Sequence, residues 1–314
     1  MESPQNCGAI VVLFDPSVEQ IAGVYRLRQQ CARVVVVDNT ALIDRSLHAG
    51  LVRDGIDVIA NRNLGGIAGA YNRGAEHLIA DGCTVLLLLD QDSTLPEGYV
   101  ETMLAASRSI ATREFLLGPK IFDINLGRYL PSFRLTAHGA KKIAINDDCD
   151  GGLLSCSFLI SSGTLLSVAA YNLLGRFRED YVIDHVDTEY CLRAAQRAVP
   201  MYLNPAIRMN HAIGTKVERR WLIFRLRAWN HSALRRYYFA RNSLLLTRSY
   251  ARRYPLIALI NLLTLNQALA ILLFETDKRK KLRLLLQGIG DGLTNRAGTY
   301  ASLHGRPATG RSET

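Results

Sequence analysis

The sequence predicts an α/β protein built on a doubly wound, mostly parallel sheet. Three largely aliphatic runs, Ala9–Phe14, Arg33–Val37 and Val85–Leu89, lack the polar alternation of a strand that has one face in water. Such runs are typical of strands covered by helices on both faces. Helix-compatible segments separate them, and this alternation predicts right-handed crossovers between parallel strands. Polar residues end each run, so we expect a polar cleft at the carboxyl edge of the sheet.

The remaining elements follow from periodicity and punctuation. Asp15 and Pro16 stop the first strand, and Ser17 is a suitable N-cap for a helix to about Gln30. In chain order we then expect a strand over 57–60, a helix that begins in the second half of 61–74 and runs to about 81, a helix over 98–111 and a strand over 115–118. Hairpins and loop over 122–152, a strand over 157–162 with a turn at Gly163, and a helix containing Ala169–Leu174 come next. A helix from Asp187, a strand over 200–203 and a helix over 232–250 follow.

Composition limits the class of protein. The 314 residues are 48% hydrophobic, which suits a large catalytic domain with an appendage. The amino terminus has no secretion signal, so we expect a cytoplasmic protein. The six cysteines are scattered, which argues against a zinc site or a disulfide framework. The net charge of +10 is concentrated after residue 215, which favours either nucleic acid or an anionic membrane surface as a partner.

Two carboxylates, Asp90 and Asp92, follow the central aliphatic run with Gln91 between them. Nearby carboxylates repel each other unless a cation lies beside them, and Mg²⁺ or Mn²⁺ is the natural occupant. The alternative is that the pair only forms a turn or a helix N-cap.

The other strand ends add polar groups to the same predicted cleft. Asp38 with Asn39 ends the second strand, and a carboxylate there can accept the ring N–H of a pyrimidine base. Gly65 and Gly69 let the backbone approach a sugar or phosphate closely. A dinucleotide-binding fold is the rival interpretation, but its glycine-rich turn should follow the first strand, where Asp15 stands.

A second group of ionisable residues lies further along the chain, at Asp184, His185, Asp187 and Glu189. Asp187 can serve as a helix N-cap, but four ionisable groups are more than a cap requires. His211, at the end of the strand after 200, is either structural or a metal ligand near the cleft.

These motifs together resemble family 2 glycosyltransferases with the GT-A fold, and within them the bacterial rhamnosyltransferases, including those of rhamnolipid biosynthesis. The resemblance covers nearly the whole chain. The motifs are Asp38-Asn39, Asn63–Asn72, Asp90–Asp92, Ser162-Gly163, Asp184–Arg193, His211 and Leu234–Asn242.

The resemblance implies roles for individual residues. Asp38 would contact the nucleotide base, Asp92 and His211 would bind Mg²⁺ or Mn²⁺, and Asp187 would be the catalytic base. Val186 stands where many relatives have Glu, which leaves open whether His185 or Asp184 orients Asp187. The residues expected to bind substrate are Asp15, Asp38, Asn39, Asn63, Gly65, Gly69, Asn72, Asp90, Gln91, Gly163, His185 and Glu189.

The implied reaction is inverting transfer of L-rhamnose from dTDP-L-rhamnose to mono-rhamnolipid, with a cell-surface polysaccharide as the alternative acceptor. We expect a catalytic domain over 1–215, with a nucleotide-sugar half (1–95) and an acceptor half (96–215). A basic helical extension would occupy 216–314 and be disordered from about 297.

Within that extension, Pro255–Phe274 is long and apolar enough to cross a bilayer. Asn261, Thr264 and Gln267 form a polar stripe, which favours a helix lying in the membrane interface; a core helix and a true span are the alternatives. We therefore expect a protein peripheral to the inner membrane that binds no nucleic acid. A nucleic-acid-binding protein remains the alternative from another class, and it predicts salt-sensitive DNA affinity.

Overall fold

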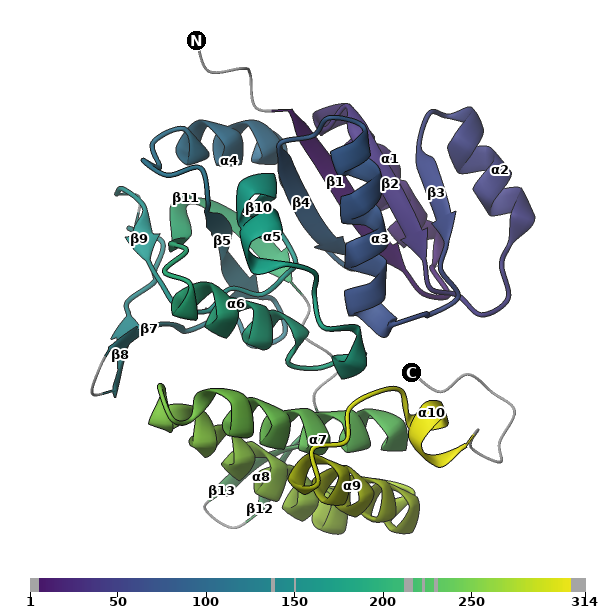
Figure 1. The fold of residues 1–314 in the computed structure, drawn as a ribbon, viewed down its shortest axis with the longest axis vertical. Helices are drawn as coiled ribbons and strands as arrows, with labels where there is room; N and C mark the ends of the chain where they lie inside the picture. The colour runs from purple at the N-terminus through teal and green to yellow at the C-terminus, as the bar shows by residue number, and fades with distance from the viewer. Residues whose placement is uncertain are drawn as a thin grey trace. The chain divides into compact units, whose positions relative to one another are not determined.

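The computed structural model describes residues 6–136, 139–149, 151–211, 217–221, 224–228 and 231–305 (Figure 1). The chain divides into two compact units. The first comprises 1–135, 141–178 and 187–212, and the second comprises 136–140, 179–186 and 213–314. The expected domain boundary at 215/216 lies outside the described residues.

A nine-stranded sheet forms the first unit, in the order β3-β2-β1-β4-β10-β5-β11-β9, with β6 paired to β5. Strands β1 to β4 are mutually parallel where they pair, and β5 is parallel to β11, as predicted for a mostly parallel sheet. The strands are β1 (Cys7–Leu13), β2 (Arg33–Asp38), β3 (Asp57–Ala60), β4 (Val85–Asp90), β5 (Leu116–Asp123), β6 (Arg128–Tyr129), β9 (Leu154–Ser155), β10 (Thr164–Ser167) and β11 (Met201–His211).

One strand was misplaced by the sequence prediction. The strand expected over 157–162 instead follows Gly163, as β10, and runs antiparallel to both β4 and β5. Gly163 has φ of 81° and donates its N–H to the Leu88 carbonyl at 2.8 Å, so the chain turns there and only then enters the sheet. Because β10 is reversed, its amino end meets the carboxyl ends of β4 and β5.

Helices cover both faces of this sheet (Figure 1). On β1, Ile10 faces α3 (Gly66–Ala80), where a Cβ on Gly74 would lie 2.5 Å from Ile10 Cγ2. The alternate residues Ala9, Val11 and Leu13 join the large core cluster that includes α1 (Val18–Gln30) and α4 (Tyr99–Ser107). The other helices are α2 (Arg45–Arg53), α5 (Val168–Leu174) and α6 (Val186–Gln196).

The second unit is mainly helical. Its elements are α7 (Ala233–Tyr250), α8 (Ile260–Phe274), α9 (Lys278–Leu293), α10 (Tyr300–His304) and the 3₁₀ turns η1 (Glu179–Tyr181) and η2 (Pro255–Leu259). It also contains the two-stranded sheet of β12 (Val217–Trp221) with β13 (Phe224–Ala228). A further two-stranded sheet is β7 (Ser132–Thr136) with β8 (Gly139–Ile143), of which only 136–140 is assigned to the second unit.

Helices α7 and α9 approach closely, because a Cβ on Gly288 would lie 2.3 Å from the Tyr237 carbonyl oxygen. Only glycine permits that contact. The expected disorder from 297 is wrong for Tyr300–His304, which form α10; Tyr300 N donates to the Tyr238 hydroxyl at 2.8 Å. Residues 306–314 lie outside the described part of the chain.

The apolar segment Pro255–Phe274 is long and apolar enough to cross a membrane by length and composition, with a mean hydropathy of 2.1, but only 22% of it is buried. Its polar stripe faces the interior of the unit: Thr264 is buried, and Asn261 Nδ2 donates to Thr247 Oγ1 of α7 at 2.7 Å. The outward residues are apolar and exposed. They are Leu256, Leu259, Leu262, Leu263, Leu265, Leu269, Leu272 and Leu273, which we call the leucine face.

Candidate active site

The carboxyl edge of the sheet gathers most of the predicted site residues. The ends of three neighbouring strands are tied there by side chains. Gln91 Oε1, after β4, accepts from the Phe14 N–H at 2.7 Å, and the Asp15 N–H donates to Thr40 Oγ1 at 2.9 Å. Gly163 reaches the same edge through the reversed strand β10. These bonds bring polar groups from the ends of β1, β2 and β4 together at one edge of the sheet.

Asp90 and Asp92 have different environments. Asp90 Oδ1 accepts from the buried Tyr71 hydroxyl at 2.6 Å. Burial raises the pKa of Tyr71 well above its usual value, and the Asp90 charge raises it further, so Tyr71 stays a donor at neutral pH. Asp92 is exposed within the turn that Ser93 N closes on the Asp90 carbonyl at 3.1 Å. Tyr71 therefore holds the Asp90 carboxylate in place, whereas Asp92 is open to solvent.

His211 ends β11 beside the segment that follows Asp92. An isolated antiparallel bridge joins Thr94 to Asn210, the residue before His211. The Nδ1 atom of His211 is buried and has no hydrogen-bond partner among the residues that the structure describes. A buried ring nitrogen without a partner is costly unless a ligand satisfies it. An imidazole nitrogen and a carboxylate oxygen are donors that Mn²⁺ and Mg²⁺ accept, so these residues fit a divalent metal.

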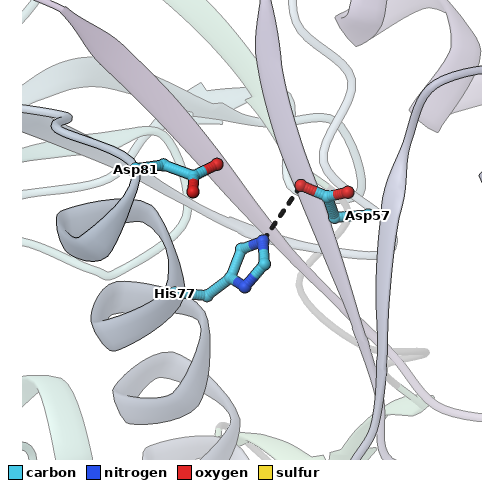
Figure 2. A group of neighbouring side chains, drawn as sticks. All are labelled: Asp57, His77 and Asp81. Carbon is cyan, nitrogen blue, oxygen red and sulfur yellow. Dashed lines mark hydrogen bonds and ion pairs between the residues drawn. The ribbon is translucent and has the colours of Figure 1, made fainter.

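A more compact cluster lies elsewhere. Asp57, His77 and Asp81 have ligand atoms within 4.8 Å of one another, and Figure 2 shows His77 bonded to Asp57. Asp57 begins β3 and His77 is in the last turn of α3, so the cluster is at the amino edge of the sheet, opposite the polar edge. Asp81 is already paired with Arg33 at 2.9 Å. We interpret this group as a surface ion-pair network.

Asp38 and Asn39 are buried at the end of β2. Asp38 is 2% exposed; its Oδ1 accepts from the Thr40 N–H at 2.8 Å, and its Oδ2 lies 2.7 Å from His48 Nε2. Asn39 Nδ2 donates to the Gly66 carbonyl at 3.2 Å, which ties the strand end to the start of α3. Sequence reasoning missed His48, because nothing local marks a histidine on α2 as the partner of Asp38.

The glycine-rich segment is shaped by close packing. Asn63 and Gly65 both have positive φ, and Gly65 precedes α3 in the left-handed conformation. A Cβ on Gly69 would lie 2.0 Å from the Leu64 carbonyl oxygen, so this position requires glycine for the fold itself. Asn72 is fully buried and makes two bonds to the Phe177 backbone, at 2.9 and 2.8 Å. Gly69 and Asn72 therefore have structural contacts.

Glu189 also has a structural contact. It is 2% exposed and forms an i,i+4 salt bridge with Arg193 on α6, whose guanidinium also donates to the Arg176 carbonyl at 2.7 Å. Asp184 and His185, in the second unit, likewise have partners there: Asp184 pairs with Arg235 at 3.0 Å. Burial lowers the pKa of His185 to about 4, with Asp184 opposing the shift.

Asp187 lies in the first turn of α6, and its Oδ1 accepts from the Thr188 N–H at 2.7 Å. The side chain borders a cavity of ≈ 190 Å³ in the first unit. Ser132 contributes a buried hydroxyl to the cavity wall. Most other walls are apolar: Ile121, Leu130, Phe158, Leu159, Ile160 and Leu203. The Asp187 charge also contributes to the raised pKa of Tyr71, whose hydroxyl donates to Asp90, so this carboxylate adjoins both the apolar cavity and the polar edge.

This is a GT-A glycosyltransferase fold: it has the order of strands described above, the antiparallel strand β10 and polar groups at the carboxyl edge of the sheet. No protein-family profile matches the chain. Among solved structures, the chain is similar to GalNAc-T7 with UDP, GalNAc and Mn²⁺ (TM-score 0.58, 13% identity, 94% of this chain and 58% of that chain). It is also similar to S. aureus TarS 1-349 (TM-score 0.55, 13% identity, 93% of this chain and 82% of that chain).

A sequence relative narrows the class. The chain is 28% identical over 277 residues to dTDP-rhamnosyl transferase RfbF of Shigella flexneri, which covers 88% of this chain and 90% of RfbF. The resemblance to family 2 rhamnosyltransferases is confirmed by this match together with the fold. Fold and match together support a glycosyltransferase.

Proposed function

We propose that the chain is an inverting rhamnosyltransferase that uses dTDP-L-rhamnose as donor. The donor is supported by the match to RfbF, and the nucleotide-binding edge by the GT-A fold. The observation that carries the reaction class is Asp187, a carboxylate in the first turn of α6 beside a cavity wide enough for an acceptor group.

In the proposed reaction, Asp187 removes the proton from an acceptor hydroxyl while that oxygen attacks the anomeric carbon of rhamnose. A new glycosidic C–O bond forms, the bond from that carbon to the diphosphate oxygen breaks, and dTDP leaves with the electron pair. Attack from the face opposite the leaving group inverts the anomeric configuration.

The polar edge would hold the donor. Asp38 would accept the base N–H, and Asp90 would lie near the ribose. Asp15, Asn39, Asn63, Gly65, Gln91 and Gly163 complete the proposed donor edge. Asp92 and His211 would hold a divalent metal, which supplies Lewis-acid neutralisation of the charge on departing dTDP when it is bound.

For the acceptor, we propose a glycolipid of the mono-rhamnolipid kind. The cavity at Asp187 has mainly aliphatic and aromatic walls, and burying an alkyl group there stabilises the complex by about 0.8 kcal/mol per CH₂. The Ser132 hydroxyl on the cavity wall offers a hydrogen-bonding group to a polar part of the acceptor. A polysaccharide would leave its hydroxyls against these apolar walls.

The acceptor proposal is consistent with a membrane-surface location. The leucine face of η2 and α8 is exposed, and basic residues flank it, with Arg252 and Arg253 before and Lys278 to Lys280 after. Each cation near an anionic leaflet contributes about 1 kcal/mol. Flotation with anionic vesicles should recover the protein, and Leu262→Gln with Leu269→Gln should release it; a wild type that stays soluble at low salt contradicts this location.

The experiment for the function is incubation with dTDP-L-rhamnose and mono-rhamnolipid, followed by mass spectrometry. We expect one added rhamnose per acceptor. The free hydroxy fatty acid, which lacks the acceptor sugar, should stay unmodified. Transfer to a cell-surface polysaccharide and not to mono-rhamnolipid would overturn the glycolipid acceptor, and no transfer to either acceptor would overturn the function.

A further inference from the structure

A second, smaller cavity adjoins Asp187. It has a volume of ≈ 10 Å³, and every residue on its wall belongs to the first unit. Leu159, Ile160 and Thr164 line both this small cavity and the cavity of ≈ 190 Å³ proposed for the acceptor, so the two cavities share part of one wall. Asp187 borders both. A group in the small cavity and an acceptor in the large one would therefore both lie beside this carboxylate.

The small cavity also adjoins the polar edge of the sheet. Leu88 is on its wall, and the Leu88 carbonyl accepts a hydrogen bond from the Gly163 N–H at 2.8 Å. Ser161, also on the wall, forms a side-chain hydrogen bond to the Tyr71 hydroxyl, which donates to Asp90 at 2.6 Å. Gly163 and Asp90 both belong to the proposed donor edge. The small cavity is therefore on the donor side of the proposed base.

The wall of the small cavity is mainly apolar. Burial raises the pKa of the Cys191 thiol and of the Tyr190 hydroxyl, so both are uncharged at neutral pH. A cavity of this size holds about one water-sized group, and a water molecule there would need about two to four polar partners. An apolar group the size of a methyl is therefore the better occupant. The buried apolar or aromatic wall residues are Leu88, Leu116, Leu166, Phe177, Tyr190 and Cys191.

The polar groups on this wall already have partners in the protein. Thr164 Oγ1 donates to the Ile160 carbonyl at 2.6 Å. The Cys191 thiol donates to the Leu159 carbonyl at 3.5 Å, and the Tyr190 hydroxyl donates to a backbone carbonyl at 3.2 Å. A hydroxyl group placed in the small cavity would have to displace one of these bonds or stay without one, and either costs free energy.

The aromatic side of the small cavity is held in place. Phe177 stacks on Tyr190, with ring centroids 4.0 Å apart. The buried side chain of Asn72 donates to the Phe177 carbonyl at 2.9 Å and accepts from the Phe177 N–H at 2.8 Å. Asn72 thus fixes the position of a wall residue, so the fold itself sets the size of the cavity.

We infer that the small cavity binds the C6 methyl group of the donor rhamnose and so makes the protein select 6-deoxy sugars. Rhamnose carries a methyl group where mannose carries a hydroxymethyl group. C6 is attached to C5, which shares the ring oxygen with the anomeric carbon, so the methyl group lies close to the reacting centre beside Asp187. This inference rests on the function proposed above. It makes Phe177, Tyr190 and Cys191 specificity-determining residues for the donor sugar.

The test compares kcat/KM for three donors with the same acceptor. They are dTDP-L-rhamnose, dTDP-L-mannose, which adds a hydroxyl on C6, and dTDP-L-lyxose, which lacks C6. We expect the wild type to prefer dTDP-L-rhamnose over either analogue on the order of 10–100-fold, the range in which an apolar site discriminates one added hydroxyl or one missing carbon.

Two substitutions at Cys191 should change these preferences in different ways. Cys191→Val adds a methyl group to the wall, so the preference for dTDP-L-rhamnose over dTDP-L-lyxose should fall at least about fivefold, with kcat/KM for dTDP-L-lyxose nearly unchanged. Cys191→Ala makes room for the C6 hydroxyl, so the preference over dTDP-L-mannose should fall at least about threefold. Cys83→Ala, at an equally buried thiol before β4, should leave all three preferences unchanged.

The inference is overturned by a wild type that uses dTDP-L-mannose within about twofold of dTDP-L-rhamnose, or by a Cys191→Val protein that loses kcat/KM equally for dTDP-L-rhamnose and dTDP-L-lyxose, as general damage to α6 would cause. If Cys191→Val does not fold, an unchanged preference in Cys191→Ala overturns it. A wild type that transfers no rhamnose would overturn the proposed function instead. Calorimetric titration with dTDP-L-rhamnose and dTDP-L-mannose would then decide the inference, and equal affinities would overturn it.

Discussion

The two edges of the central sheet each carry a histidine among acids, but with opposite character. At the amino edge, Asp57, His77 and Asp81 are compact, with ligand atoms within 4.8 Å of one another. At the carboxyl edge, Asp92 and His211 lie on segments joined only by the bridge from Thr94 to Asn210. By compactness alone, the amino edge would be chosen as the metal site.

The chemistry of the partners reverses that choice. The amino-edge groups already satisfy one another, with His77 on Asp57 at 2.9 Å and Arg33 on Asp81 at 2.9 Å. At the carboxyl edge, His211 Nδ1 is buried and has no partner in the described part of the chain. Parallel strands also direct ligands to their carboxyl ends. A buried ring nitrogen that needs a ligand at the carboxyl edge is thus better evidence for a metal site than a compact cluster at the amino edge.

Metal-dependent nucleotide binding should show the largest difference between the edges. We expect Asp92→Ala combined with His211→Ala to lower dTDP affinity in Mn²⁺ on the order of 10–100-fold, because these two residues would hold the proposed metal ion. Asp57→Asn combined with His77→Gln should have no effect. Calorimetric titration of dTDP, with and without a chelator, measures both. Equal losses at both edges would break the comparison.

Stability should show the next largest difference, through two histidine–aspartate pairs. The pair His48–Asp38 is largely buried, whereas both members of His77–Asp57 are at least 36% exposed. His48→Ala leaves a buried carboxylate without its partner and should lower the free energy of unfolding by about 1–3 kcal/mol. His77→Ala should cost less than about 1 kcal/mol. Urea denaturation of both variants checks this, and a greater loss for His77→Ala would contradict it.

The smallest effect is a pH dependence that arises in the second unit. Burial lowers the pKa of His185 and of His231 from 6.5 to about 4. Below pH 6.5 the unfolded chain therefore binds more protons than the folded one, so these histidines make stability fall as pH drops from 6.5 toward 4. The urea midpoint of His185→Gln should depend less on pH in that window. A midpoint that depends equally on pH in both proteins would exclude His185 as a source.

Much of this fold was predictable because buried parallel strands leave a clear signal. The aliphatic runs 33–37 and 85–89 match β2 and β4, and the polar residues after them reach the expected edge. Periodicity does not reveal pairing direction, so it could not show that Gly163 reverses the chain into antiparallel β10. The sequence showed the turn at Gly163 but not that strand β10 follows it.

The candidate site was less predictable, since partners distant in sequence decide what a polar residue does. Asn72 donates a hydrogen bond to the Phe177 backbone. Glu189 forms a salt bridge with Arg193, and Asp38 pairs with His48. Arg193 follows Glu189 at a helical spacing that the sequence shows, but nothing local marks Phe177 or His48 as a partner. The polar stripe that begins at Asn261 faces inward, where Asn261 donates a hydrogen bond to Thr247 of α7. A helical wheel shows that the stripe exists but not whether it faces water or protein.

The most direct test of the account is Asp187→Asn, with turnover and donor binding measured on the same preparation. The amide keeps the size of the side chain but cannot accept the acceptor proton. We expect turnover of dTDP-L-rhamnose to fall about 10²–10⁴-fold, with dTDP affinity changed less than about twofold. A variant with near-normal turnover, or one that loses dTDP affinity in parallel with turnover, would contradict the assignment of Asp187 as the base.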